Sequence, residues 1–416
     1  IWVGSNDGLV HLTKDGGLNW FNVTPKDVMK GGRVDSVEPS SHDPATAYIS
    51  VLRYQLGDWK PYIYKTKNYG ESWELKANGI PNDYPVRVLR EDPIKKGLLF
   101  AGTEFGIFVS QNGGKSWSKF QKNLPITPVT DLKIHRGDLV LSTMGRSFWI
   151  MDNINYLRNF SFNDNDFLYP ITNTIRYRNR PSNNNHVSYP RTSVDIDYKI
   201  LKESVGEILI MIMDNENNLI NSYKSINKNQ NIENYEMSTN EFTFISNSNI
   251  SKKIGVNRFK WDMRHRGSWN KNSRFSYRNG PMAKPGIYKV ILTIDGSSFT
   301  ENFEIISDPR IKDVSPEVYE EQEKILLEIR DLMSDVRLFE DKVSKMIEKK
   351  PKNKKYLSIA KELNTKEGTY MQPMMIDQIR YLQSMLSRAD QKPGMDALNR
   401  LKELKLKFNI LKNKLG

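Results

Sequence analysis

Carboxylate side chains are the residues of this sequence best suited to chemistry on a substrate. Hydrolysis of a glycosidic bond needs two Asp or Glu side chains flanking that bond, roughly 5 Å or 6.5–9.5 Å apart. Within the first 157 residues the candidates are Asp35, Glu38, Asp92, Glu104 and Asp131. Their positions along the chain bring no two of them together, so the sequence assigns no catalytic pair.

Glu104 and Asp131 are the candidates for a catalytic acid. Glu104 follows a predicted inner strand in "AGTEFG", at an end where the loops of successive strands gather; the alternative interpretation is an exposed acid in a tight turn. Arg146 lies in the equivalent part of "STMGRSFW". It is a candidate for binding an anionic or carboxylate ligand, because a guanidinium group donates paired hydrogen bonds to such groups.

The sequence lacks the residues that several other kinds of site require. The chain has no cysteine, which excludes disulfides, thiolate metal sites and cysteine nucleophiles. The five histidines are scattered without a pair at metal-ligand spacing. No phosphate-binding loop, nucleophile elbow or dinucleotide fingerprint is present. We therefore expect no metal and no cofactor.

The formal net charge of +13 favours anionic partners in general. Lys and Arg are nevertheless spread along the chain and interleaved with acids, which indicates a solvated surface with a lysine bias. One stretch, "RYRNRPSNNNHVSYPR", combines basic and aromatic residues as nucleic-acid sites do, but its Pro and Asn content indicates a linker. We expect no nucleic-acid partner.

An internal repeat predicts the strands and turns that position these residues. Each copy has a hydroxyl residue, then Asp or Asn two positions on, Gly two further, and Trp after three more. The copies "TKDGGLNW", "TKNYGESW" and "SQNGGKSW" begin at Thr13, Thr66 and Ser110, so their starts lie 53 and 44 residues apart. Their predicted structural residues are Asp15, Gly17 and Trp20, then Asn68, Gly70 and Trp73, then Asn112, Gly114 and Trp117.

The repeat spacing matches one four-stranded blade of a β-propeller. In each turn Asp or Asn accepts backbone hydrogen bonds, Gly supplies a positive φ, and the Trp ring packs between neighbouring blades. Short strand patterns fill the intervals, and residues 129–152 form a last unit. Because a propeller must close on itself, the remaining blades are expected upstream in the same protein or in a partner.

These turns resemble Asp-boxes, or BNR repeats, which sialidases, xyloglucanase-type glycoside hydrolases and sortilin-type propellers share. The stretches "GTEFGIFVSQNGGKSW" and "LSTMGRSFWIMDN" are most similar to large bacterial sortilin-like BNR-repeat proteins, often labelled glycosyl hydrolases. The resemblance covers residues 1–157 and implies a structural role for the boxes at the propeller's periphery. The sequence departs from the family at Asn68 and Asn112, where Asp is usual, and at Tyr69. It has no recognisable cluster of three arginines, which argues against sialidase chemistry.

The composition changes after residue 157. Residues 158–190 are rich in Asn, Arg and Pro and are predicted to be a linker. Alternating strand patterns return over 191–310, where six or more short strands favour an immunoglobulin-like β-sandwich. "GVNRFKWDMR" and "KPGIYKVIL" resemble the flagellar-hook-cap type of immunoglobulin-like domain, which implies that Trp261 and Tyr288 are core aromatics.

Residues 311–416 are predicted to form an α-helical domain, either a small bundle or a hairpin. Ser315 and Pro316 mark the start of a first helix, and Pro351 ends it. An apolar stripe at three-and-four spacing indicates a buried face, with a partner-binding coiled coil as the alternative. The stripe comprises Ile325, Leu326, Ile329, Leu332, Met333 and Leu338.

Together these features predict a mainly β protein that comprises part of a β-propeller, a sandwich and a helical region. The expected function is binding of a peptide, protein or glycan by a secreted or bacterial envelope protein, in the periplasm or on the outer surface. No catalysis is expected in this region. The alternative is an Asp-box glycoside hydrolase whose main carboxylates lie in upstream blades. A third interpretation makes the helical tail a docking element on a larger envelope complex.

Two features of the chain bear on its context. It opens with Ile1 inside a strand pattern, so we interpret it as a piece of a longer protein. No apolar run approaches the roughly 20 residues of a transmembrane helix, so no transmembrane segment is expected.

Overall fold

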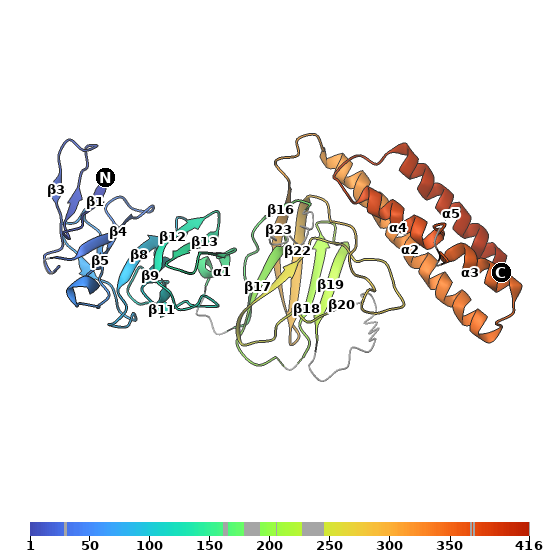
Figure 1. Ribbon diagram of the computed structural model, residues 1–416, viewed down its shortest axis with the longest axis horizontal. Coiled ribbons are helices and arrows are strands. Elements are labelled where there is room, and N and C mark those ends of the chain that lie inside the picture. Colours follow the sequence, from blue (N-terminus) through green and yellow to red (C-terminus); the bar gives the residue numbers. More distant parts are fainter. Residues whose placement is uncertain are drawn as a thin grey trace. The chain divides into compact units, whose positions relative to one another are not determined.

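The computed structural model describes all residues except 29–30, 161–164, 179–191, 205, 227–244, 367, 369–370 and 416. The chain divides into two units, Ile1–Ser161 and Phe162–Gly416 (Figure 1). It is mainly β, with several sheets and a helical C-terminal region, as predicted.

The first unit consists of four antiparallel sheets in which each strand pairs with the next along the chain. The first and last sheets have three strands and the two middle sheets have four. The short 3-10 helix Tyr54–Leu56 follows the second strand of the second sheet, and α1 (Asn155–Arg158) follows the last sheet. The strands are β1 (Trp2–Gly4), β2 (Val10–Leu12) and β3 (Phe21–Asn22); β4 (Arg33–Pro39), β5 (Ala47–Leu52), β6 (Ile63–Thr66) and β7 (Glu74–Leu75); β8 (Val86–Glu91), β9 (Leu99–Thr103), β10 (Gly106–Ser110) and β11 (Ser118–Lys119); and β12 (Val129–His135), β13 (Asp138–Thr143) and β14 (Phe148–Met151).

Neighbouring sheets of this unit cover each other's faces. Every residue of β5, β9 and β10 is buried, so these strands are covered on both sides. One core cluster joins the second and third sheets and includes Tyr48 and Trp117. Another joins the first and second sheets and includes Val10 and Tyr64. Successive sheets therefore stack face to face, with the core between them.

The opening strands β4, β8 and β12 of the last three sheets lie next to one another. Near the start of each, the register of its pairing with the next strand shifts, as at a β-bulge, which bends a strand and redirects a side chain. These shifts fall between Val34 and Ser36, between Val86 and Val88, and between Val129 and Asp131. The three sheets are thus built on one plan.

The second unit begins with two sheets around one shared core. Trp261 and Tyr288 are buried in that core, as predicted. One sheet has the order β15-β17-β21 and the other β16-β23-β22-β18-β19-β20. The strands are β15 (Phe167–Leu168), β16 (Thr174–Arg176), β17 (Val194–Ile200), β18 (Leu209–Asp214), β19 (Leu219–Ser225), β20 (Ile245–Asn247), β21 (Gly255–Trp261), β22 (Gly286–Ile294) and β23 (Ser297–Ser307).

Part of the segment predicted as a linker belongs to these sheets. β15 and β16 both lie within 158–190, and β16 pairs in parallel with β23. The linker prediction is therefore wrong for these residues, because strands of two or three residues are too short to show a periodic pattern. Its Asn-rich remainder, 179–190, lies outside the described residues.

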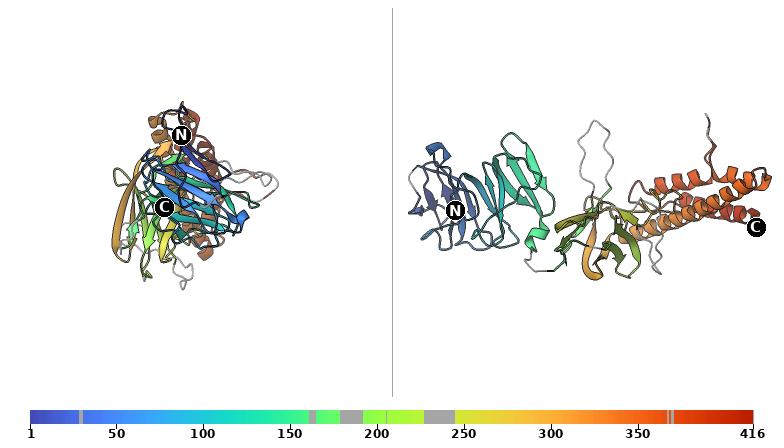
Figure 2. Two further views of the ribbon diagram at one scale, coloured as in Figure 1. Left: turned by 90° about the vertical axis from the view of Figure 1, so that its left-hand side faces the viewer. Right: turned by 90° about the horizontal axis from the view of Figure 1, so that it is seen from below.

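Four helices complete the second unit, as the helical pattern predicted. They lie alongside one another in the orange-to-red part of Figure 2 and share one core cluster. Among the described residues, no helix has the length and apolar character to cross a membrane. The helices are α2 (Pro316–Lys349), α3 (Lys354–Leu363), α4 (Met375–Leu386) and α5 (Met395–Leu415).

One of the six residues predicted for the buried stripe of α2 is not buried, and two further valines are. Leu338 is 49% exposed, whereas Val336 and Val343 are buried. Leu338 lies five residues after Met333, which carries it off the face that a 3.6-residue period keeps turned to the core. The other five predicted residues of the stripe are buried.

A buried ionic cluster joins the sheets of the second unit to its helices. Asp390, which follows α4, accepts contacts from Arg176 Nη1 at 2.6 Å and Arg178 Nε at 2.7 Å, and its side chain is fully buried. Gln322 of α2 donates from Nε2 to the carbonyl oxygens of Leu386 and Ala389. The basic stretch considered for nucleic acid thus uses its first two arginines inside the protein.

We expect Asp390→Asn to lower the free energy of unfolding of the second unit by about 3–5 kcal/mol, because two guanidinium groups then lose their buried counter-charge. Urea denaturation followed by the helical circular dichroism signal measures this. Asp331→Asn is the matched control: it breaks the exposed pair with Arg330 and should cost at most about 1 kcal/mol. Equal losses in both variants would contradict the prediction.

Candidate functional site

The first box turn is closed by side-chain hydrogen bonds. The Thr13 hydroxyl donates to Asp15 Oδ1 at 2.7 Å and accepts from the Gly17 N–H at 2.9 Å. Asp15 Oδ1 also accepts from the Asn19 N–H at 3.0 Å. The second glycine of the turn has a φ of +106°, a conformation that side chains with a Cβ rarely adopt.

The other two turns repeat these contacts. In each, the hydroxyl group donates to the Asn side-chain oxygen and accepts from the N–H of the second Gly-position residue, and the Asn side-chain oxygen accepts from the N–H four residues later. The residues are Thr66, Asn68, Gly70 and Ser72 in the second turn, and Ser110, Asn112, Gly114 and Ser116 in the third.

Where Asn replaces Asp in the turn, the residue four positions later changes from Asn to Ser. Asp15 Oδ2 accepts from Asn19 Nδ2 at 2.8 Å. In the second turn the direction is reversed, because Asn68 Nδ2 donates to the Ser72 hydroxyl at 2.9 Å. The hydrogen bond from the Asn19 N–H, followed by that from the Thr13 hydroxyl, holds the pKa of Asp15 well below its ordinary value. Asn in place of Asp therefore keeps the turn and removes its charge.

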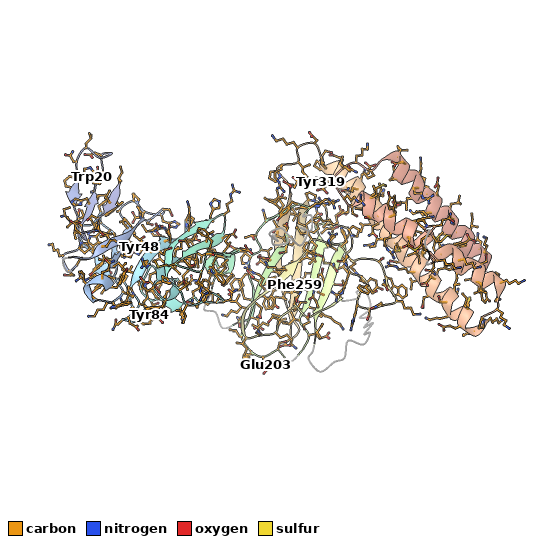
Figure 3. The ribbon with its side chains drawn as sticks, in the orientation of Figure 1. Trp20, Tyr48, Tyr84, Glu203, Phe259 and Tyr319 are labelled. Carbon is orange, nitrogen blue, oxygen red and sulfur yellow. The ribbon has the colours of Figure 1, made fainter. Side chains whose placement is uncertain are left out.

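The box tryptophans bind the preceding sheet. The indole N–H of Trp73 donates to the carbonyl oxygen of Val23 at 2.7 Å, and the indole N–H of Trp117 donates to the backbone carbonyl oxygen of Lys76 at 2.7 Å. Each acceptor is the third residue after the tryptophan of the previous box. Trp20, labelled in Figure 3, is 44% exposed, and its indole N–H has no partner among the residues that the structure describes.

Four aromatic side chains from two neighbouring sheets gather at one end of the first unit. We call Tyr54, Trp59, Tyr84 and Phe105 the aromatic cluster (Tyr84 is labelled in Figure 3). The Trp59 ring stacks on Phe105 with centroids 6.4 Å apart, and Tyr54 lies 5.7 Å from Trp59. Tyr84 lies 4.9 Å from Phe105 on its other side. Trp59 is 44% exposed and the other three rings are partly buried, so Trp59 is the ring of the cluster most accessible to the solvent.

The connection between β5 and β6 carries Trp59 and is held by a polar network. Asp58 accepts from Arg53 Nε at 3.0 Å and from the Tyr62 hydroxyl at 2.7 Å. Arg53 is buried and Tyr62 directly precedes β6, so the carboxylate ties the loop to the sheet. The position of Trp59 is thus determined by the fold.

A charged pair borders the aromatic cluster. Glu104, in the turn between β9 and β10, contacts Arg87 Nη2 at 2.5 Å, and both side chains are largely buried. The Arg87 guanidinium also lies 5.7 Å from the ring centroid of Tyr54. Asp35 pairs with Arg33 at 2.6 Å, and burial raises its pKa although Arg33 and Arg87 oppose that shift. Two acids thus lie near Arg87 at the same end of the unit.

Asp131 belongs to a second ionic group. Arg90 of β8 contacts Asp131 at 2.9 Å and Glu38 at 3.6 Å, and it donates to the Ser36 hydroxyl at 2.8 Å. Burial raises the pKa of Glu38. Arg90 therefore links the three adjacent opening strands β4, β8 and β12.

The structure does not bring the predicted site residues together. Arg146 is exposed in the turn between β13 and β14. This turn is equivalent to the turn of Glu104, because the first residue of each donates its N–H to the carbonyl oxygen of the proline before an opening strand: Met144 to Pro128, and Glu104 to Pro85. Among the described residues, no hydrogen bond or ion pair joins Glu104, Asp131 and Arg146 to one another. The remaining acid candidate, Asp92, is fully buried and paired with Arg158 at 2.9 Å, which is a structural contact.

The sequence analysis missed Arg87, Arg90 and Trp59. Both arginines lie in "VRVLRE", where they interrupt a valine-rich strand, and that interruption is the signal that a charged side chain faces a neighbouring sheet. Trp59 lies outside the boxes and offers no comparable signal. In the part of the chain that the structure describes, no group of three or more His, Asp or Glu side chains is placed to hold a metal ion.

No protein-family model matches this sequence, and no curated protein matches it. Among solved structures, the chain is similar to YCF48 bound to a D1 peptide at 16% identity, with a TM-score of 0.29 over 53% of this chain and 64% of that one. It is similar to YCF48 from Cyanidioschyzon merolae at 17% identity, with a TM-score of 0.29 over 36% of this chain and 50% of that one. It is also similar to the GH74 xyloglucanase from Xanthomonas campestris at 14% identity, with a TM-score of 0.30 over 47% of this chain and 31% of that one.

The chain spans less than two thirds of the length of each of these structures. Their TM-scores are too low to establish a shared fold, and no residue role follows from them. The geometry of the chain itself therefore carries what is proposed below.

We expect Trp73→Phe to loosen the contact between the first two sheets. It leaves the Val23 carbonyl without its donor, which should lower the local free energy of opening by about 1–3 kcal/mol. Hydrogen–deuterium exchange of peptides spanning residues 18–28 measures this. Trp20→Phe is the control, since its indole N–H has no partner in the described structure, and it should leave exchange unchanged. Similar exchange in both variants would show that the bond does not hold the sheets together.

Proposed function

We propose that the first unit is a series of β-propeller blades. Three observations support this: the shared plan of the sheets, the adjacency of β4, β8 and β12, and the indole bonds from the second and third boxes to the previous sheet. In a propeller the boxes lie on the outer strands and serve the fold, which agrees with the internal bonding of all three turns. Trp20 and the first sheet would pack against a further blade, expected upstream in the same protein.

We propose that this propeller binds a peptide, protein or glycan at the aromatic cluster. The observation that carries the proposal is the aromatic cluster, in which Trp59 stacks on Phe105 and Tyr54 and Tyr84 make tilted contacts with them, beside the Arg87–Glu104 pair. Aromatic faces supply large contact areas with little loss of side-chain freedom, and nearby charged groups orient a polar ligand. Loops at one end of a rigid scaffold are where binding residues are usually found.

The proposed binding is non-catalytic in this region. Glu104 is paired with Arg87 and Asp131 with Arg90, so each candidate acid already has a cation as its partner. A carboxylate held by a guanidinium group already has its oxygens engaged in charge-assisted contacts, so it is less free to act on a substrate. The arrangement therefore suits recognition better than proton transfer.

Glycoside hydrolysis is the second candidate function. Burial raises the pKa of both Asp35 and Glu38, as a general acid requires. In this alternative the chain contributes an acid on β4 and the main carboxylates lie in upstream blades.

The rest of the chain and its location can be assigned in the same way. We propose an immunoglobulin-like sandwich for the two sheets of the second unit, followed by the helical domain at residues 311–416. We also propose that the protein is secreted or lies in the bacterial envelope, as its resemblance to bacterial sortilin-like BNR-repeat proteins implies. These modules would then hold the propeller within a larger assembly.

We expect Trp59→Ala to weaken ligand retention at least about tenfold, since a central aromatic residue dominates such contacts. The measurement uses immobilised protein, a panel of polysaccharides and sialylated glycans, and a library of short peptides. Trp20→Ala is the matched control, because Trp20 and Trp59 are both 44% exposed. Retention that is lost equally in both variants, or in neither, would contradict a site at the aromatic cluster.

New reducing ends, assayed in the same wells, separate the two functions. Binding without released sugar is the expected result. Release of sugar that disappears in Asp35→Asn, Glu38→Gln or Glu104→Gln would instead establish hydrolysis.

A further inference from the structure

The charges of the long helix α2 are segregated along its length. Residues 316–341 contain nine acids and three bases, which gives 3 − 9 = −6. Residues 342–355, which end the helix and begin α3, contain seven lysines and one glutamate, which gives 7 − 1 = +6. A solvated surface normally mixes the two signs along a helix. This separation marks the end of the bundle far from the sheets as a distinct surface.

The seven lysines of this end are all exposed. We call them the lysine tip. Lys345 pairs with Asp341 at 2.6 Å; among the described residues, the other six form no ion pair. The tip comprises Lys342, Lys345, Lys349, Lys350, Lys352, Lys354 and Lys355.

More positive charge reaches the same region from α5. Its last turn carries Lys412 and Lys414, and Lys414 Nζ lies 3.1 Å from Glu362 Oε1 near the end of α3. Residues 411–416 contain these two lysines and no acid, so the last turn adds two positive charges, of which Lys414 is paired with Glu362. The lysine tip is therefore not neutralised by the neighbouring helix.

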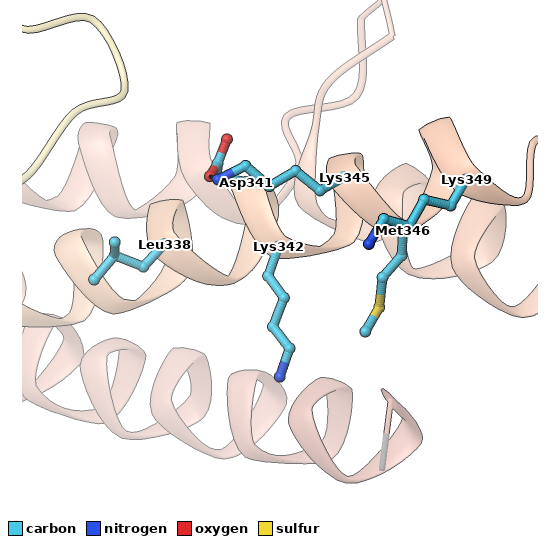
Figure 4. Close-up of a pocket in the computed structure, with 6 residues that line it drawn as sticks. All are labelled: Leu338, Asp341, Lys342, Lys345, Met346 and Lys349. Atoms are coloured by element: carbon cyan, nitrogen blue, oxygen red, sulfur yellow. Dashed lines mark ion pairs between the residues drawn. The ribbon is translucent and has the colours of Figure 1, made fainter.

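Apolar side chains lie beside the lysines on the outer face of α2. Leu338 is 49% exposed, and with Met346 it lines an open groove of ≈ 320 Å³. Lys342, Lys345 and Lys349 border the same groove (Figure 4). In α3, Leu357 is 37% exposed two residues after the last lysine of the tip. The surface thus combines ammonium groups with accessible hydrocarbon.

We propose that the lysine tip docks the protein onto the surface of an anionic lipid bilayer. Clusters of four to eight basic residues bind anionic headgroups, and each lysine adds to the attraction. The aliphatic stems of the lysines and the exposed Leu338 and Leu357 lie against the boundary between headgroups and acyl chains. The partner is thus a membrane surface that the helices contact without crossing it.

The composition of the tip favours lipid over nucleic acid. Residues 342–355 contain no arginine, the residue that binds phosphates with paired hydrogen bonds. The tip also offers no exposed aromatic side chain on which a base could stack, since Tyr356 is partly buried. Flexible point charges suit a fluid array of headgroups, which has no fixed spacing.

The test is co-sedimentation of the whole chain with vesicles of phosphatidylglycerol and phosphatidylcholine in equal parts, against vesicles of phosphatidylcholine alone. We expect binding only to the anionic vesicles. Binding should fall steeply as salt rises from about 0.1 M to 1 M, because the Debye length shrinks from about 10 Å to about 3 Å. The triple variant Lys349→Glu, Lys352→Glu, Lys355→Glu should lose at least about tenfold in affinity.

A matched triple variant controls for total charge. Lys95→Glu, Lys96→Glu and Lys115→Glu change three exposed lysines of the first unit, and both triples lower the formal net charge from +13 to 13 − 6 = +7. The control should keep its vesicle binding, and circular dichroism should show both variants folded. Equal losses in the two triples, or no binding to anionic vesicles, would overturn the proposal. Tighter tip-dependent binding to duplex DNA or heparin than to the vesicles would also overturn it, in favour of a soluble polyanion.

Discussion

The first unit depends on one constraint: a small sheet that is apolar on both faces must be covered on both faces. β5, β9 and β10 are buried along their whole length, so a single four-stranded sheet of this kind has no stable solvent-facing side. Stacking the sheets face to face satisfies this requirement and buries Tyr48 and Trp117 between them. The indole bonds to the carbonyl oxygens of Val23 and Lys76 then tie the second sheet to the first and the third sheet to the second.

The candidate site follows from that stacking. Because the sheets share one plan, their equivalent turns meet at one end, and residues far apart in the chain become neighbours there. Trp59 and Phe105 stack although they belong to different sheets. Arg87 reaches both Glu104 and the ring of Tyr54. The box turns, in contrast, use their polar groups internally, so they support the fold and leave ligand contacts to these loops.

The second unit combines local and long-range effects in another way. Its first helix, α2, begins at Pro316 and ends at Lys349, two residues before Pro351, because caps and helix-breaking residues act within a few positions. Its sheets were harder to predict. β16 is three residues long and exists because β23 offers it a partner. Arg176 and Arg178, which appear in the sequence as part of a basic linker, become the cations that neutralise Asp390.

The sequence by itself determined what is local and periodic: the box turns and the strand and helix patterns. Each of these depends on residues within one turn, strand or helix. Only the tertiary structure decided which charges are paired, that Asp92 is structural, and that Trp59 joins an aromatic cluster. These outcomes depend on the distance between side chains from different elements, and no spacing along a single chain encodes that distance.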